Sequence, residues 1–131
     1  IKAVVRRHQA KKMIVVDVVS DGESITYDEL FASHTDAQVI INTSPIGMYP
    51  KVNSSPVDLA QFPNCQAVMD VVYNPLTTKL VAQARELGMI GVTGLEMLVA
   101  QAKYAVEIFL NTKIDDDRIQ EIYEEIKKEF L

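Results

Sequence analysis

The sequence has little of what several classes of protein require. It contains a single cysteine, Cys65, and two isolated histidines, His8 and His34, with no CxxC or HExxH pattern. A single cysteine cannot form an internal disulfide, so a reducing cytoplasm is the expected compartment. A zinc site needs a set of cysteine, histidine or carboxylate ligands at defined spacing, which the sequence does not supply. We therefore expect no bound metal.

Long apolar runs and an excess of positive charge are also absent. No apolar stretch approaches the roughly 20 residues that a membrane-spanning helix needs. The 13 Lys and Arg residues are outnumbered by 18 Asp and Glu residues, which gives a net charge of −5. A surface that binds nucleic acid or an anionic membrane carries a basic patch. We expect neither nucleic acid nor a membrane as a partner.

The overall composition is typical of a globular protein. The 131 residues are 48% hydrophobic and 24% charged, so global disorder is not expected. This length suits one domain or a piece of a larger one. The first residue is Ile1 and not Met, which favours the second interpretation.

The pattern of apolar residues predicts strands that alternate with helices. β-branched runs predict buried strands over 13–19, 37–42, 67–73 and 89–92. Helical periodicity predicts helices over 1–9, 27–33, 77–87 and 94–110, and a last helix capped by Asp115 to Asp117. Residues 43–63 are rich in Pro, Ser and Asn and are expected to form a loop region. The alternation predicts the α/β class, a mostly parallel sheet with helices on both faces.

Ligands of such sheets bind beyond the carboxyl ends of the strands, where loops and helix N-termini converge. Three segments follow predicted strands in this way, namely 42–50, 73–75 and 93–97. We expect these segments to form one site. No His, Lys or carboxylate in them has an obvious partner for acid–base catalysis.

The polar residues Asn42, Thr43 and Ser44 follow the second predicted strand directly. Their short amide and hydroxyl side chains can donate and accept hydrogen bonds, so they could bind a phosphate, a ribose or a nicotinamide. The alternative is a turn that only closes the strand. The residues alone leave both interpretations open.

Two further polar side chains lie near the expected site. Tyr73 ends the third predicted strand and either presents its hydroxyl to a substrate or packs its ring and bonds a backbone group. Gln101 shares one face of its predicted helix with Gly94 and Met97 and needs a partner there, either protein or ligand. Met97, like Met48, is expected to fill the core.

The glycines Gly88, Gly91 and Gly94 do not have the spacing of a dinucleotide-binding fingerprint. They are better interpreted as a helix end, a tightly packed strand and a helix start. Gly94 opens the long predicted helix, so its backbone could approach a ligand closely.

Three segments together resemble the shikimate dehydrogenase family, which includes the quinate/shikimate enzymes. They are IINTSPIGM at 40–48, DVVYNP at 70–75 followed by Thr78, and GLEMLVAQA at 94–102. Each segment is moderately specific, and in this order and spacing they are strongly so. The resemblance covers nearly the whole chain and is most secure over 36–110.

The resemblance implies a two-domain enzyme with an N-terminal substrate domain and a C-terminal NADP-binding domain of Rossmann type. Enzymes of this family reversibly reduce 3-dehydroshikimate to shikimate with NADPH, in the pathway to the aromatic amino acids. The resemblance implies that Tyr73 and Gln101 contact shikimate. It also implies cofactor contacts from the main chain of Val71 and Gly94, and from a cleft lined by Asn42, Thr43 and Ser44.

The chain also departs from the family pattern. The family's catalytic Lys and Asp lie in the N-terminal domain, and nothing here matches that domain. The glycine-rich phosphate loop is expected before residues 1–9, and residues 16–20 replace a segment whose Arg binds the NADP 2′-phosphate. We therefore expect 1–131 to be part of a nucleotide-binding domain, incomplete at its N-terminal edge, without catalytic residues and inactive alone.

Alternatives remain at this stage. If the spacing around Asp17 is intact, its carboxylate would favour NAD over NADP by repelling the 2′-phosphate. A quinate-preferring relative fits the same motifs. A different class is a non-catalytic binding or assembly module on a half-Rossmann scaffold. An incomplete sheet exposes apolar surface, so a homodimer is conceivable under either interpretation.

Overall fold

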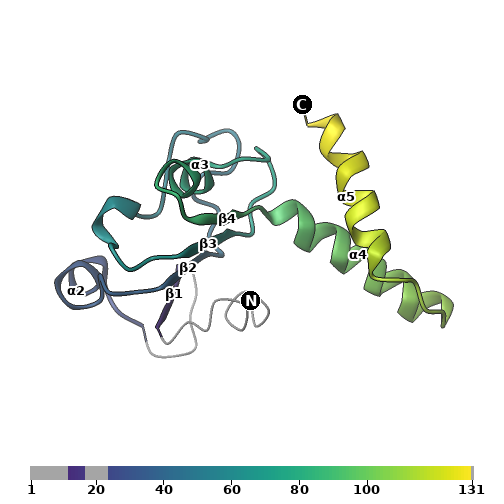
Figure 1. Ribbon diagram of the computed structural model, residues 1–131, viewed down its shortest axis with the longest axis horizontal. Helices are drawn as coiled ribbons and strands as arrows, with labels where there is room; N and C mark the ends of the chain where they lie inside the picture. Colours follow the sequence, from purple (N-terminus) through teal and green to yellow (C-terminus); the bar gives the residue numbers. More distant parts are fainter. Residues whose placement is uncertain (1–11, 17–23, 131) are drawn as a thin grey trace.

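The computed structural model describes residues 12–16 and 24–130 of the chain. Its centre is a four-stranded parallel sheet in the order β1-β2-β3-β4 (Figure 1). The strands are β1 (Met13–Val16), β2 (Val39–Asn42), β3 (Ala67–Asp70) and β4 (Ile90–Val92). The sheet confirms the predicted parallel α/β class. The predicted helix over 1–9, the end of the strand predicted over 13–19, and Asp17 lie outside the described residues.

The strand order rises steadily along the chain, so right-handed connections place their helices on one face of the sheet. These elements are α2 (Tyr27–Ser33), the 3₁₀ helix η1 (Leu59–Gln61) and α3 (Lys79–Glu86). Their apolar side chains form one core with side chains of the two central strands, including Leu30, Leu59, Leu80, Ile40 and Val68. A complete doubly wound fold reverses its strand order, and the described strands contain no such reversal.

The second face of the sheet carries a separate buried cluster. Val39, Ile41, Ala67 and Met69 alternate along β2 and β3 with the residues of the first core. In contrast, Met13 and Val15 of the edge strand β1 are 38% and 44% exposed. Met13 and Val15 therefore expose apolar surface at this edge.

Two antiparallel helices project from the sheet as a hairpin (Figure 1). They are α4 (Gly94–Leu110), which has the predicted bounds, and α5 (Asp117–Glu129). Near the end of α4, Ile108, Phe109 and Leu110 are 79%, 86% and 69% exposed. The described residues include no helix that is both long enough and apolar enough to cross a membrane.

A buried ion pair on α4 contacts the loop and the start of α5. The side chains of Lys103 and Glu107 are only 3% and 7% exposed, and their charged atoms lie 3.1 Å apart. Lys103 also donates to Asp116 at the start of α5, and Glu107 accepts from the Ile114 N–H at 2.8 Å. The bond to Asp116 raises the pKa of Lys103, and the Ile114 N–H lowers the pKa of Glu107. Asp116 therefore binds α4 and does not cap its own helix, whereas Asp115 accepts from the Asp117 N–H as predicted.

Some boundaries differ from the sequence prediction for local reasons. β3 ends at Asp70 and not at Tyr73, because the Asp70 carboxylate accepts from the Val72 N–H and turns the chain out of the sheet. The short η1 lies inside the predicted loop region and is capped by the Asp58 side chain. Gly88 follows α3 with φ +75°, which confirms the predicted left-handed helix end.

Candidate functional site

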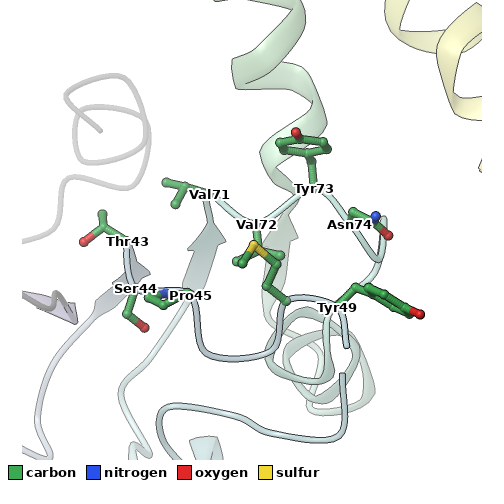
Figure 2. A pocket seen from close by; sticks show the side chains of 9 residues that line it. Thr43, Ser44, Pro45, Tyr49, Val71, Val72, Tyr73 and Asn74 are labelled. Atoms are coloured by element: carbon green, nitrogen blue, oxygen red, sulfur yellow. The ribbon is translucent and has the colours of Figure 1, made fainter. Parts of the chain in front are cut away.

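A pocket of about 410 Å³ lies at the carboxyl ends of β2 and β3 (Figure 2). Its walls are the segment after β2 and the segment after β3, and the lining residues are Thr43, Ser44, Pro45, Met48, Tyr49, Val71, Val72, Tyr73 and Asn74. The volume suits a small organic molecule or part of one. Two of the three segments predicted to form a site, 42–50 and 73–75, meet here, whereas 93–97 is not part of the lining.

The first wall, the segment after β2, contains two hydroxyl groups that both donate a hydrogen bond to other groups of the protein. The Thr43 hydroxyl donates to the Val16 carbonyl at 2.8 Å, and the Ser44 hydroxyl donates to Asn42 Oδ1 at 2.6 Å. The Thr43 oxygen keeps its lone pairs, whereas the Ser44 oxygen also accepts from the Ile46 N–H at 3.4 Å and keeps one, in a residue that is only 3% exposed. This wall is therefore suited to a ligand that donates, such as a carboxamide NH₂ or a ribose hydroxyl.

The second wall combines apolar surface with one phenol. Val71 and Val72 contribute apolar side chains, and Tyr73 is 43% exposed. Within the described part of the chain, no group forms a hydrogen bond with the Tyr73 hydroxyl, so the hydroxyl is available to a ligand. Figure 2 shows Thr43 and Ser44 at one end of the pocket and Asn74 and Tyr49 at the other.

The two walls are also joined to each other. The Tyr49 N–H donates to the Asn74 carbonyl at 3.0 Å, and the Val71 N–H donates to the Asn42 carbonyl at 3.0 Å. Because the Val71 N–H is occupied, its carbonyl is the main-chain group left to bind a ligand. These two hydrogen bonds fix the backbone of each wall to the backbone of the other.

Gly94 supports the second wall from behind. Its N–H donates to the Val72 carbonyl at 3.2 Å, and a Cβ at this position would lie 2.1 Å from the Val71 carbonyl oxygen. The sequence predicted a close approach of the Gly94 backbone to a ligand, and in the structure the close contact is with the backbone of Val71 and Val72. Gly94 itself is outside the lining.

The other residues predicted for the site are placed differently. The side chain of Asn42 is fully buried behind the pocket, and Gln101 is exposed on α4 outside the lining. Met48 and Met97 are 46% and 40% exposed, so the prediction that they fill the core is wrong for both. Met48 lines the pocket instead.

Sequence reasoning assigned no role to Asp70, which lies directly behind the pocket. The carboxylate is fully buried, and burial raises the pKa of this group above its ordinary value. It accepts hydrogen bonds from Asn42, Val72 and Thr78. An acid inside the apolar run AVMDVVY was the signal that could have identified it, because a buried carboxylate needs several donors.

The lining itself defines what the pocket can do. Among the residues that the structure describes, no lysine, arginine, histidine or carboxylate lines it, and no group of metal-ligating side chains is present. The lining can bind and orient a ligand through apolar contact and a few hydrogen bonds. Proton transfer by a lysine, a histidine or a carboxylate would need groups from outside this lining.

No protein-family model matches the chain, but individual proteins do. The shikimate dehydrogenase (NADP(+)) of Clostridium perfringens (strain ATCC 13124) is 39% identical over 115 residues, which are 88% of this chain and 40% of that protein. The crystal structure of a chorismate mutase/shikimate 5-dehydrogenase fusion protein from Clostridium acetobutylicum superposes with a TM-score of 0.84. It is 30% identical, and the match covers 97% of this chain and 57% of that one.

A second similar structure contains ligands. The shikimate 5-dehydrogenase from Thermus thermophilus, in complex with NADP(H) and shikimate, has a TM-score of 0.61 and 26% identity. That match covers 72% of this chain and 36% of the Thermus chain. This chain thus spans less than two thirds of the length of each of these three proteins.

Proposed function

This chain matches the shikimate dehydrogenase family, and on that premise we propose that it forms the nucleotide-binding part of an NADP-dependent shikimate dehydrogenase. The reaction is reversible hydride transfer between NADPH and the keto carbon of 3-dehydroshikimate. The observation that carries the proposal is the pocket at the ends of β2 and β3, whose lining comes from two of the segments that resemble the family. The substrate domain and its acid–base groups would lie outside these 131 residues.

The pocket would hold the nicotinamide end of the cofactor, which supplies the hydride when bound. The Val71 carbonyl and the hydroxyl oxygens of Thr43 and Ser44 would accept from the carboxamide and ribose groups. The apolar side chains of Val71 and Val72 would contact the ring. These groups fit a neutral, planar ligand with few donors, and they include no charged group that would bind a phosphate.

Asn42 and Gly94 would act on the cofactor indirectly. The side-chain amide of Asn42 donates hydrogen bonds to other groups of the protein, and the Gly94 N–H donates to the backbone of the second wall. Both residues would therefore set the position of the groups that touch the nicotinamide.

Tyr73 and Gln101 would face the substrate. The Tyr73 hydroxyl has no partner within the described part of the chain, which suits a contact with a shikimate hydroxyl or carboxylate. Gln101 is exposed on α4, on the same helix face as Gly94 and Met97. Its side chain is thus free to reach a substrate that a second domain brings to this face.

The direct experiment is an assay of shikimate-dependent NADP⁺ reduction. We expect activity in the protein as expressed from its gene and none in the 131-residue chain alone. Parallel reactions with quinate and with NAD⁺ separate the related specificities. No shikimate-dependent turnover by the gene product would contradict the proposal, and rapid turnover by the 131 residues alone would contradict the placement of the acid–base groups.

One observation favours the alternative of an assembly module. Ile108, Phe109 and Leu110 expose apolar side chains at the end of the hairpin, and such surface commonly marks an interface. A homodimer through this hairpin would be seen by sedimentation. A monomer at high concentration would argue against it.

A further inference from the structure

A network of buried polar groups crosses the two central strands at their carboxyl ends. Asn42 of β2 and Asp70 of β3 are partners in the strand register, and both are 0% exposed. Asn42 Nδ2 donates to Asp70 Oδ1 at 3.0 Å. Burying a carboxylate in an apolar sheet is unfavourable unless donors surround it. The presence of an acid here therefore calls for an explanation beyond packing.

The Asp70 carboxylate accepts hydrogen bonds from three separate segments. Besides Asn42, Oδ1 accepts from the Val72 N–H at 3.0 Å, in the wall that follows β3. Oδ2 accepts from the Thr78 hydroxyl at 2.7 Å, at the start of α3. An ionised carboxylate offers acceptors on both oxygens and carries no donor of its own. An amide of the same size would present a donor in place of one of them.

Asn42 extends the network to the opposite wall. Its Nδ2 also donates to the Ile46 carbonyl at 3.1 Å, and its Oδ1 accepts from the Ser44 N–H at 3.1 Å and the Ser44 hydroxyl at 2.6 Å. Neither Asn42 nor Asp70 lines the pocket. Nearly all of their bonds end on residues that line it or lie within its loops.

We propose that Asp70 is a positioning residue for this pocket, which holds Val72 directly and Ser44 through Asn42 at the separation that the ligand requires. The identity of the ligand as a nicotinamide nucleotide rests on the proposed function above. The mechanical role of Asp70 rests only on the network. A residue needed for packing alone would direct its bonds into the core, whereas these bonds set the two walls.

The test compares variants in which one bond of the network is changed. Asp70→Asn keeps the shape but places a donor opposite Thr78. Thr78→Val removes the hydroxyl that donates to Asp70, and with it the N-cap of α3, in which Thr78 accepts from the Val81 N–H. Thr26→Val is the matched control, because Thr26 caps α2 and has no contact with Asp70. Thr78→Ser keeps the hydroxyl and is the expected rescue.

Two quantities are measured in the protein as expressed from its gene. They are the dissociation constant for NADPH and the hydrogen-exchange rates of the Val72 and Ser44 amides. Asp70→Asn and Thr78→Val are expected to raise both by roughly tenfold, the usual effect of losing one hydrogen bond to a charged group. Thr78→Ser should resemble the wild type. Thr26→Val should lower the unfolding temperature without changing either quantity.

The outcomes separate the two claims. Unchanged exchange at Val72 and Ser44 in both test variants would overturn the positioning role, as would an equal effect of Thr26→Val. If the wild type binds no nucleotide, the proposed function fails, and the exchange rates still decide whether Asp70 holds the walls. If Asp70→Asn fails to fold, the comparison of Thr78→Val with Thr26→Val and Thr78→Ser still tests the positioning role of Asp70.

Discussion

The backbone of Gly94 packs directly on the carbonyl group of Val71, with no room for a side chain between the start of α4 and the pocket wall. Gly94→Ala would place a methyl carbon 2.1 Å from that oxygen, so the wall or the helix must move. We expect a loss of about 1–3 kcal/mol in the free energy of unfolding and weaker nucleotide binding. Denaturant unfolding and nucleotide titration measure the two effects.

Gly88→Ala is the control for this substitution. Gly88 has φ +75° and open space around its Cβ position, so alanine there strains only the backbone, by about 1–2 kcal/mol. It lies away from the pocket and should leave nucleotide binding unchanged. Wild-type binding by Gly94→Ala would show that the Val71 carbonyl is not part of the site.

The buried pair of Lys103 and Glu107 should decide whether α5 stays attached to α4. Lys103→Met leaves the Glu107 carboxylate buried without its nearer cationic partner and removes the bond to Asp116, so we expect faster hydrogen exchange throughout α5. Lys113→Met is the control, because Lys113 is 93% exposed and lies 3.8 Å from Glu107. Equal exchange rates in the two variants would contradict a role for the buried pair.

The pKa of the Asp70 carboxyl is raised, so we expect this residue to contribute more to the free energy of unfolding at low pH. Burial raises the pKa of its carboxyl in the folded protein. Its contribution to stability is therefore fully present below the unfolded pKa and is lost as the pH rises through the folded pKa. The free energy of unfolding of the wild type, minus that of Asp70→Asn, should increase as the pH falls from about 7 towards about 4.

Unfolding curves of both proteins across this range test the sign. Carboxylates with lowered pKa values, such as Glu107, are present in both proteins and cancel in the difference. A difference that decreases on acidification would mean that hydrogen bonds outweigh burial at Asp70.

Gln101 is expected to matter for substrate and not for folding. It is exposed on α4, so Gln101→Ala should change the free energy of unfolding by less than about 0.5 kcal/mol. In the protein as expressed from its gene, the same substitution should raise the Michaelis constant for shikimate or lower turnover. Gln120→Ala, at an exposed position of α5, is the control. Unchanged kinetics in Gln101→Ala would remove this residue from the site.

Much of the fold follows from local signals in the sequence. The β-branched runs locate all four strands, and α2 and α4 have the predicted bounds. The prediction extended β3 to Tyr73 because Val71 and Val72 are typical strand residues. The Asp70 carboxylate overrides that propensity by binding the Val72 N–H, and this bond depends on the folded surroundings of Asp70.

The sequence predicted where the pocket lies but not how its lining is arranged. Periodicity and the rule for parallel sheets located the loops after β2 and β3, and the family resemblance named Tyr73 and Val71. Which polar groups face the pocket depends on hydrogen bonds between distant segments. The bond from Asn42 to Asp70 spans 28 residues and turns Asn42 from a candidate ligand contact into a support. No spacing in the sequence indicates such a bond.

On the proposed function, the pocket between these two loops receives the nicotinamide end of NADPH. The most direct measurement follows backbone amide chemical shifts of the isotope-labelled protein during titration with NADPH. We expect saturable shifts at the amides of Thr43, Ser44, Val72 and Tyr73 and unchanged shifts at the exposed end of α4. Saturation with NADPH that leaves these four amides unmoved would contradict it.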